Sequence, residues 1–289
     1  MQHIDEVLAL LDLTPSGGGS FRGEHPDTAL QRTFGGQVLA QALSAMYRTV
    51  PEARLAHSLK GYFLRPGSTR HPIDYLVTPT RDGGSFSHRH VEASQAGTTI
   101  FTMSASCKSA EPGLEHARTP AKPPLPPEEC PRLAEVLGSR SRRTGEVWER
   151  EWAALDTRYV GSSNMEHGDG ARLQLWLRSK GALPDDPRVH QMVLAYASDL
   201  TLLAVSTLPH PGAFGSPSLQ MATIDHTLWF HRHIRADEWV LYDQSSPNSA
   251  NALGLSFGQL YSADGVLGAS AAQEGLIRVT DDRPRTGLV

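Results

Sequence analysis

An internal repeat constrains the fold of this 289-residue chain more than any other feature of its sequence. The segment QVLAQALSA at 37–45 aligns with QMVLAYASD at 191–199, and in both segments apolar residues recur at helical spacing. Farther along, YFLR at 62–65 aligns with WFHR at 229–232, within segments of strand character. The repeat therefore predicts two copies of one unit, each with a helix followed by strands.

The first copy predicts one helix followed by a meander of strands. The glycine pair at 35–36 allows the backbone to approach something closely, and the residues behind it have helical periodicity. One helix and several long strands indicate an α+β unit in which a curved antiparallel sheet wraps the helix. Helices are expected over 1–13 and 34–46, and strands over 21–25, 57–65, 73–81, 86–94 and 99–107.

The composition changes between the two copies. From Lys108 to about Arg143 the chain is rich in proline and in charged residues and has no sustained periodicity, which is typical of a linker. We therefore expect a first domain over 1–112, a Pro-rich linker over 113–145 and a second domain over 146–289.

The overall composition favours a small-molecule substrate. The net charge is −4 and the basic residues are scattered, so nothing indicates a nucleic-acid partner or a membrane surface. No segment has the roughly 18 consecutive apolar residues of a membrane span, and the first 13 residues lack the features of a secretion signal. Cys107 and Cys130 form neither a metal-ligand set nor a disulfide framework. We expect a cytoplasmic protein.

The segment ATIDHTLWFHR at 222–232 has the composition of a strand. Ile224, Leu228 and Phe230 share one parity and are expected on a buried face, whereas Thr223 and Asp225 share the other parity.

Two further polar residues stand in apolar surroundings. Asp199 falls in a helical stripe that otherwise holds Met, Tyr and Leu, and Gln273 lies in a later apolar strand. An ionised carboxylate in such a stripe is costly unless it is hydrogen-bonded. On the residues alone, an Asp that caps a loop is an equally good interpretation, and Thr223 and Gln273 read as ordinary strand residues.

Several longer motifs resemble the acyl-CoA thioesterase II family. The resemblance covers most of the chain except the Pro-rich segment and both ends, and it implies a double hotdog fold, in which two long helices are each wrapped by an antiparallel sheet. In this family an Asp, a Ser or Thr, and a Gln form the catalytic set, which implies Asp199, Thr223 and Gln273 here. The matching segments are GGQVLAQAL (35–43), HSLKGYFLRPG (57–67), RDGGSFSHRHV (81–91), AYASDL (195–200), ATIDHTLWFHR (222–232), EWVLYDQSS (238–246) and DGVLGASAAQEGLIR (264–278).

The implied set suits hydrolysis of a thioester. A carboxylate, a hydroxyl and an amide can together hold one water molecule, and Asp199 can remove its proton as the water attacks the thioester carbonyl. This chemistry needs no cofactor, no metal and no covalent acyl-enzyme. The repeat places Ala45, Ala56 and Ala105 at the equivalent positions of the first copy, so we expect one active site per chain, mainly in the second copy.

Rival signals in the sequence are weaker. Gly254-Leu255-Ser256-Phe257-Gly258 matches the nucleophile elbow of α/β-hydrolases, but no histidine follows it in the chain, and we interpret the match as accidental. His226, His231 and His233 are accompanied by no obvious added carboxylate or cysteine set, so a metal site is not expected. Asp225 competes with Asp199 for the role of general base, and the sequence leaves this open.

Two alternative functions remain at this stage. A hydratase on the same fold would carry a motif such as Asp-x-Asn-Pro-x-His, which the sequence lacks. A non-catalytic acyl-CoA-binding protein would not need all three polar residues. Hotdog sheets have edges and faces that tend to be covered by a partner, and the resemblance implies a homo-oligomer, either a dimer or a tetramer.

Overall fold

The computed structural model describes residues 1–120, 124–164, 170–216 and 218–280. Within these ranges the strands are β1 (Thr14–Gly17), β2 (Ser20–Gly23), β3 (Arg54–Phe63), β4 (Ile73–Asp82), β5 (Phe86–Gln95), β6 (Thr98–Ser109), β7 (Leu155–Asn164), β8 (Ala171–Ser179), β9 (Leu219–Phe230), β10 (Val240–Ala250), β11 (Leu253–Ser262) and β12 (Leu267–Val279). The α-helices are α1 (Ile4–Leu11), α2 (Gly35–Tyr47), α3 (Leu133–Arg140), α4 (Arg142–Trp152) and α5 (Pro187–Ser198), and the 3₁₀-helices are η1 (Pro127–Glu129) and η2 (Leu203–Thr207).

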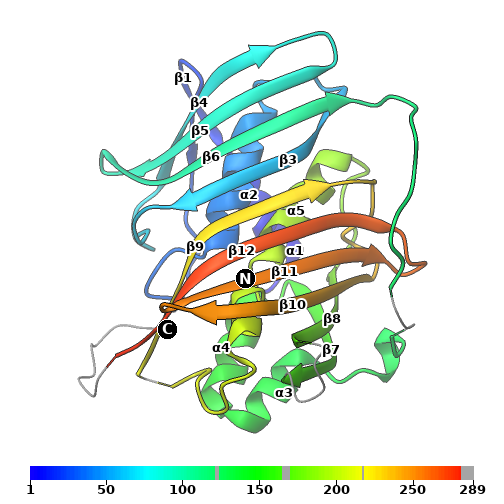
Figure 1. Ribbon diagram of the computed structural model, residues 1–289. Coiled ribbons are helices and arrows are strands. Elements are labelled where there is room, and N and C mark those ends of the chain that lie inside the picture. Colours follow the sequence, from blue (N-terminus) through cyan, green and yellow to red (C-terminus); the bar gives the residue numbers. More distant parts are fainter. Residues whose placement is uncertain (121–123, 165–169, 217, 281–289) are drawn as a thin grey trace.

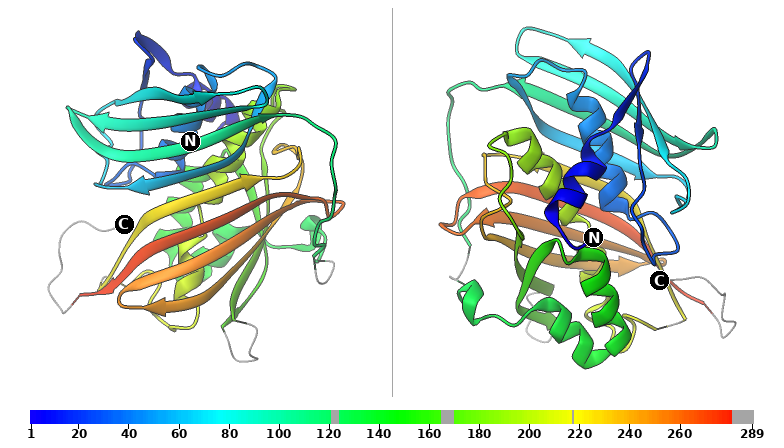
Figure 2. Two further views of the ribbon diagram at one scale, coloured as in Figure 1. Left: turned by 45° about the horizontal axis from the view of Figure 1, so that its top comes forward. Right: turned by 180° about the vertical axis from the view of Figure 1, so that it is seen from behind.

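The strands form one 12-stranded antiparallel sheet whose order repeats about its centre. The order is β1-β2-β4-β5-β6-β3-β9-β12-β11-β10-β8-β7, so each strand of the first half has a counterpart at the same distance from the central β3–β9 pair. Both long helices lie on the same face of this sheet (Figures 1 and 2). The arrangement confirms the predicted α+β double hotdog.

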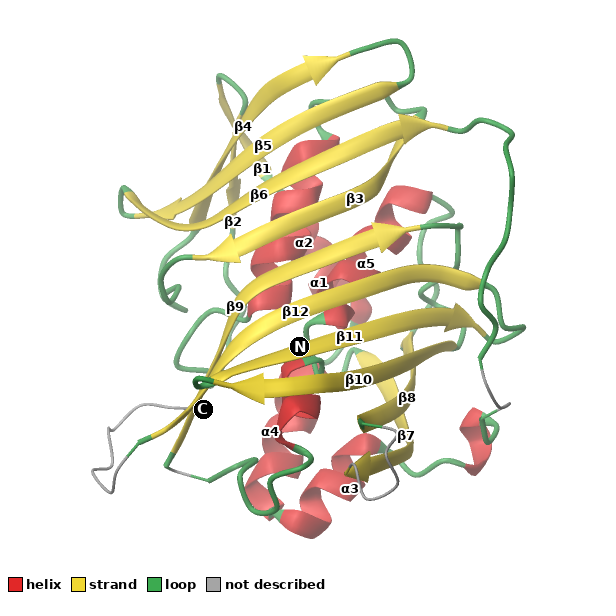
Figure 3. Ribbon diagram, in the orientation of Figure 1, coloured by secondary structure: helices red, strands yellow, loops and turns green. Residues whose placement is uncertain are grey.

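The two helices share a core. They pack against each other and against the inner face of the sheet (Figure 3). Leu39 and Leu43 of α2 are fully buried in the same cluster as Leu194 and Ala197 of α5 and Leu228 of β9. Since burying one leucine side chain contributes about 1.5–3 kcal/mol, this shared cluster holds the two halves together.

The Pro-rich segment contains regular structure in its later part. Beyond Pro131 the chain forms α3 and α4, and Leu133, Ala134 and Trp148 from these helices are buried against Leu175 of β8. Residues 133–140 and 142–145, which fall within the expected Pro-rich linker, are therefore helical. The proposed division of the chain into domains stays a prediction. No helix among the described residues is long and apolar enough to span a membrane.

Candidate active site

Asp199 follows the last residue of α5 and lies under the sheet. The helix begins with Pro187 at its first position, where Asp186 accepts a hydrogen bond from the Arg188 backbone N–H at 2.9 Å. It ends at Ser198, and Asp199 is the C-cap residue, with a side chain only 5% exposed. A carboxylate at the negative end of a helix dipole needs compensating donors from elsewhere.

Thr223 of β9 and Gln273 of β12 supply two of these donors. Gln273 Nε2 donates to Asp199 Oδ1 at 2.5 Å and to Thr223 Oγ1 at 2.7 Å. Thr223 Oγ1 donates to Asp199 Oδ1 at 3.2 Å. The structure therefore brings together the three residues that the family resemblance implied, from one helix end and two neighbouring strands.

The third donor comes from the first half of the chain. The Gly36 backbone N–H, at the start of α2, donates to the Asp199 carboxylate. A Cβ atom at Gly35 would lie 2.6 Å from Asp199 Oδ2, so the absence of a side chain permits this approach. The positive end of the α2 dipole thus faces the carboxylate at the negative end of α5. The sequence indicated a close approach at this glycine pair but not its partner.

Burial controls the charge of the site. Burial raises the pKa of Asp199 to about 6, and the hydrogen bonds from Gln273, Thr223 and Gly36 oppose this rise. A pKa near neutrality suits a general base, because the carboxylate is ionised at pH 7 yet still basic enough to accept a proton.

A bulge in β9 places Thr223 on the inner face. The pairing of β9 with β12 shifts between Asp225–Glu274 and Thr223–Gly275, which leaves Ile224 as an extra residue. The expectation that Ile224 is buried was therefore wrong, since this side chain is 36% exposed. Thr223 and His226 consequently face the same side of the sheet.

The bulge also separates Asp225 from Thr223. Asp225 Oδ2 lies 3.5 Å from Lys60 Nζ, and Asp225 Oδ1 accepts a hydrogen bond from the Glu274 backbone N–H at 3.2 Å. Its carboxylate lies on the outer face, away from the cluster around Asp199. The expectation that Asp225 shares the face of Thr223 was wrong because simple alternation fails across a bulge.

His226 is a buried neighbour of the site that sequence reasoning treated only as a metal candidate. It pairs with Gln273 across β9 and β12, and its Nε2 lies 2.9 Å from Ser198 Oγ. Its Nδ1 lies 3.8 Å from Asp199 Oδ1. Burial lowers the pKa of His226 to about 3, so the imidazole is neutral at physiological pH and the charge of the site resides on Asp199.

The other sequence candidates lie elsewhere. Ser256 is buried within β11 and pairs with Gln273, so it does not occupy a strand–turn–helix elbow. Both cysteine side chains are buried as free thiols. No group of three His, Cys, Asp or Glu residues that could hold a metal ion occurs in the described part of the chain.

A cavity of about 270 Å³ opens beside the cluster of Asp199, Thr223 and Gln273. It lies between the start of α2, the end of β3 and the start of β9, and its lining includes Gly35 and Thr223. Apolar side chains such as Phe63, Phe101 and Met221 form much of the remaining wall. We refer to it as the Thr223 cavity.

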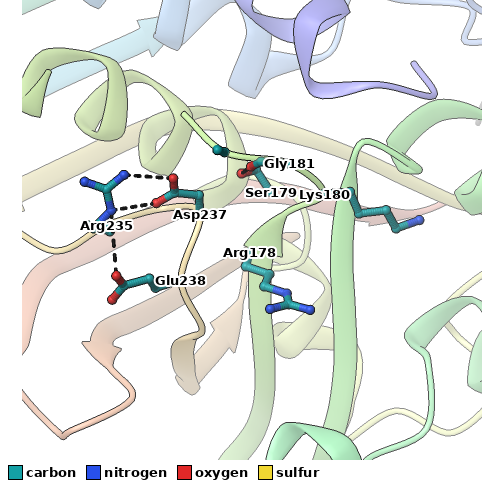
Figure 4. Close-up of a pocket in the computed structure, with 8 residues that line it drawn as sticks. Arg178, Ser179, Lys180, Gly181, Arg235, Asp237 and Glu238 are labelled. Carbon is teal, nitrogen blue, oxygen red and sulfur yellow. Dashed lines mark hydrogen bonds and ion pairs between the residues drawn. The ribbon is translucent and has the colours of Figure 1, made fainter. Parts of the chain in front are cut away.

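A larger hollow of about 480 Å³ lies at the other end of α5 (Figure 4). It is lined by Arg178, Lys180, Arg235, Asp237 and Glu238 among others. The guanidinium of Arg235 is already paired with the carboxylates of Asp237, Glu238 and Asp185. None of the three catalytic candidates lines this hollow, so its size alone does not indicate an active site.

The equivalent position in the first half is filled by other groups. Ala45, Ala56 and Ala105 are buried there. The Tyr47 hydroxyl donates to Gln191 Oε1 and accepts from the Ala56 backbone N–H at 2.9 Å, and Gln191 Nε2 donates to the Ala56 carbonyl at 3.0 Å. This closed network leaves no carboxylate where the first half would need one.

The two long helices, each wrapped by antiparallel strands, define the molecule as a double hotdog protein. Comparison with known proteins narrows this class. A family model described as acyl-CoA thioesterase matches residues 150–276, and one described as the acyl-CoA thioesterase N-terminal domain matches residues 23–108. The chain belongs to the acyl-CoA thioesterase family, as the sequence motifs suggested, and it is a thioester hydrolase.

Individual relatives are similar over nearly their whole length. Acyl-CoA thioesterase 2 of Haemophilus influenzae is 35% identical over 96% of this chain and 99% of its own. Human acyl-coenzyme A thioesterase 8 is 36% identical over 94% of this chain and 89% of its own. The solved structure of acyl-CoA thioesterase II TesB2 from Mycobacterium marinum has a TM-score of 0.82 and 39% identity, with 96% of this chain and 100% of that chain covered.

Proposed function

We propose that this enzyme hydrolyses acyl-CoA to a free fatty acid and CoA by direct attack of a water molecule held by Asp199, Thr223 and Gln273. The observation that carries the proposal is the convergence of the three polar side chains on one buried point, where Thr223 also lines the Thr223 cavity. Neither the binding-protein nor the hydratase alternative is favoured by a specific feature of the site.

The proposed reaction uses the groups as follows. Asp199 accepts a proton from the water as the water oxygen bonds to the thioester carbonyl carbon. The hydroxyl of Thr223 and the amide of Gln273 orient the water, and the carbonyl oxygen becomes an oxyanion beside the positive end of α2. The carbon–sulfur bond then breaks, and the thiolate of CoA leaves and takes up the proton.

Release of free thiol from a panel of acyl-CoAs, followed with a thiol reagent, tests this function. We expect thiol release, whereas a hydratase or a binding protein would release none. A Cys107→Ser, Cys130→Ser double variant and a Ser256→Ala variant should stay active, because none of these residues is a nucleophile in this mechanism. An acyl group trapped covalently on any of them would overturn direct attack by water.

The activity should fall at acidic pH. The carboxylate acts as a base only when ionised, and burial raises the pKa of Asp199 to about 6. We therefore expect kcat/KM to fall roughly tenfold per pH unit below this value, with no contribution from His226, whose pKa is about 3. A pH profile with an acid limb near 4 instead would contradict the assignment of the base.

Asp199 should also make the free energy of unfolding depend on pH. Whereas activity rises with pH, this contribution to stability should fall as pH rises. The folded-state pKa of Asp199 lies above the ordinary value of 3.8, so the folded state binds more protons between these two values. Its contribution therefore lowers the free energy of unfolding as pH rises through this window, by roughly 3 kcal/mol in full. Denaturant titrations at pH 4 and pH 7, compared between the parent and an Asp199→Asn variant, would isolate this contribution.

Thr223→Ala and Gln273→Ala should each reduce activity. Each substitution removes one hydrogen bond to the water, at a cost of about 1–3 kcal/mol in transition-state stabilisation, or roughly 5- to 150-fold in kcat. Combining either with Asp199→Asn should cost much less than the product of the single effects, since the three side chains act on one water. Fully multiplicative effects in a double-mutant cycle would show that they act independently.

We also propose that the chain forms a homo-oligomer, either a dimer or a tetramer. The face of the sheet turned away from α2 and α5 carries exposed aromatic side chains on three strands, namely Tyr62, Trp229 and Phe257. Such a face favours contact with a partner. Sedimentation at micromolar concentration should show a species larger than 31.4 kDa, and a monomer alone would contradict the proposal.

The two free buried thiols support a cytoplasmic location.

A further inference from the structure

The Thr223 cavity contains two positive charges and no negative one. Arg32 and Arg65 are the charged residues of its lining, and the remaining lining residues are apolar, glycine or threonine. Arg32 lies three residues before Gly35, and Arg65 lies two residues after Phe63, so both arginines belong to segments that form the cavity wall.

Two hydrogen bonds hold the arginine-bearing segments side by side. The Thr33 backbone N–H donates to the Gly67 carbonyl at 3.0 Å, and Thr33 Oγ1 donates to the Ser68 carbonyl at 2.9 Å. A Cβ atom at Gly67 would lie 2.8 Å from Thr33 Oγ1, so the glycine permits this contact. These bonds join Thr33, which follows Arg32, to Gly67 and Ser68, which lie just after Arg65. The two arginines themselves are far apart in the chain.

The segment before Arg32 is also anchored from the second half. Glu151 of α4 accepts a hydrogen bond from Thr28 Oγ1 at 2.6 Å and another from the Ala29 backbone N–H at 2.9 Å. The Glu151 side chain is buried, so these bonds fix the loop that leads to Arg32. The position of Arg32 is therefore set by packing from both halves rather than by an ion pair.

Neither arginine has a carboxylate partner among the described residues. Arg32 is half-buried and has no ion pair there, and Arg65 donates to the Thr99 carbonyl at 2.7 Å, which leaves most of its donors for other groups. The hollow in Figure 4 differs, because its Arg235 is satisfied by three carboxylates. A guanidinium with free donors at a cavity next to a catalytic cluster is suited to bind an anion.

We propose that Arg32 and Arg65 together form a subsite that binds phosphate groups of the CoA moiety. The inference rests on the proposed function, because it identifies the anion from the substrate: the acyl chain and the thioester are uncharged, whereas CoA carries several phosphates. The apolar part of the cavity wall contacts the uncharged part of the substrate, and the arginines hold the charged part. The subsite thus recognises the leaving group rather than the acyl chain.

A comparison of two substrates tests the subsite. Arg32→Gln, Arg65→Gln and the double variant are assayed with an acyl-CoA and with the N-acetylcysteamine thioester of the same acyl group, which has the same reacting bond but no phosphate. We expect kcat/KM for acyl-CoA to fall about 10- to 100-fold for each single variant, mainly through KM. The value for the N-acetylcysteamine thioester should not change, which also shows that the variants fold.

Arg70→Gln is the matched control, because Arg70 is an exposed arginine of the same loop that does not line the cavity. It should affect neither substrate. Equal losses on both substrates, or no loss on acyl-CoA, would overturn the subsite. Binding of CoA itself, measured by calorimetry, gives an answer that does not depend on turnover: the arginine variants should bind CoA at least about tenfold more weakly than the parent, and equal affinity would overturn the inference. Failure of the parent to hydrolyse either thioester would instead contradict the proposed function.

Discussion

Replacing Asp199 by Asn is expected to lower kcat by roughly 10² to 10⁴, which is the usual contribution of a general base. The substitution keeps the shape of the side chain and leaves an amide that can still form hydrogen bonds with Gln273 and Thr223. It removes only the group that accepts the proton. Steady-state rates of thiol release at pH 7 or above, where the parent carboxylate is ionised, measure the effect.

Asp225→Asn is the matched control for this prediction. Asp199 contacts Thr223 of β9, and Asp225 lies on β9 itself. Asp225, however, is paired with Lys60 on the outer face. Its substitution should cost far less activity. If Asp225→Asn abolished turnover in a folded protein while Asp199→Asn left it intact, the general base would be Asp225 and the assignment to Asp199 would be wrong. The Asp199→Asn variant should be as stable as the parent or slightly more stable, because an ionised buried group is lost.

Gly35→Ala is expected to lower kcat by about 10² without unfolding the protein. The added Cβ would lie 2.6 Å from Asp199 Oδ2 and 3.1 Å from the Phe63 ring, so the carboxylate or the start of α2 must move. A displacement of about 1 Å in a catalytic group is sufficient for a loss of this size. Rates of thiol release together with a thermal unfolding curve distinguish lost geometry from lost fold.

Gly84→Ala provides the comparison, since a Cβ there would meet no atom within 4 Å. It should leave both activity and stability nearly unchanged. The repeat agrees with the steric interpretation of Gly35, because the residue that corresponds to Gly35 in the second copy is Val189, and the residue that corresponds to Asp199 in the first copy is Ala45. Unchanged turnover in Gly35→Ala would mean that the close approach of α2 has no part in catalysis.

The periodic parts of the fold could be predicted from the sequence. The expected helix over 34–46 and the strands over 57–65, 73–81, 86–94 and 99–107 correspond to α2 and β3–β6 within a few residues. Their apolar spacing and turn residues agree with their tertiary environment, so local and global preferences coincide. The internal repeat then predicted a helix followed by strands for the second half, by analogy with the first. The two edge strands, the four-residue β1 and the ten-residue β7, were not expected.

The contacts of the site could be predicted only in part. Family motifs implied Asp199, Thr223 and Gln273, but strand alternation put Asp225 on the wrong face because one extra residue, Ile224, enters the ladder. A bulge depends on backbone pairing with β12 and has no clear signal in side-chain periodicity. The hydrogen bond from the Gly36 N–H to Asp199 could not be predicted from side-chain patterns either, because its donor is a backbone group of a helix in the other half.

The same bulge occurs in both halves. In β3 the pairing with β6 shifts between Ala56 and Ser58, which leaves His57 as the extra residue at the position that corresponds to Ile224. The backbone geometry that turns Thr223 inward is therefore present around Ala56 as well, without the hydroxyl. The first half thus has the same backbone form as the second half at this position but lacks its polar side chains.

Two copies of one unit in a single chain can differ from each other in a way that two identical subunits cannot. In a dimer of two identical units, two-fold symmetry makes both active sites change together, so an alanine in place of the catalytic carboxylate would inactivate the whole assembly. Joining the units in one polypeptide removes this restriction, because each copy can mutate alone while the other keeps turning over substrate. In the first half, which lacks the three polar groups, the Tyr47 hydroxyl instead donates to Gln191 of the second half and so joins α2 to α5. An inhibitor that binds the reacting centre should accordingly titrate at one equivalent per 31.4 kDa chain.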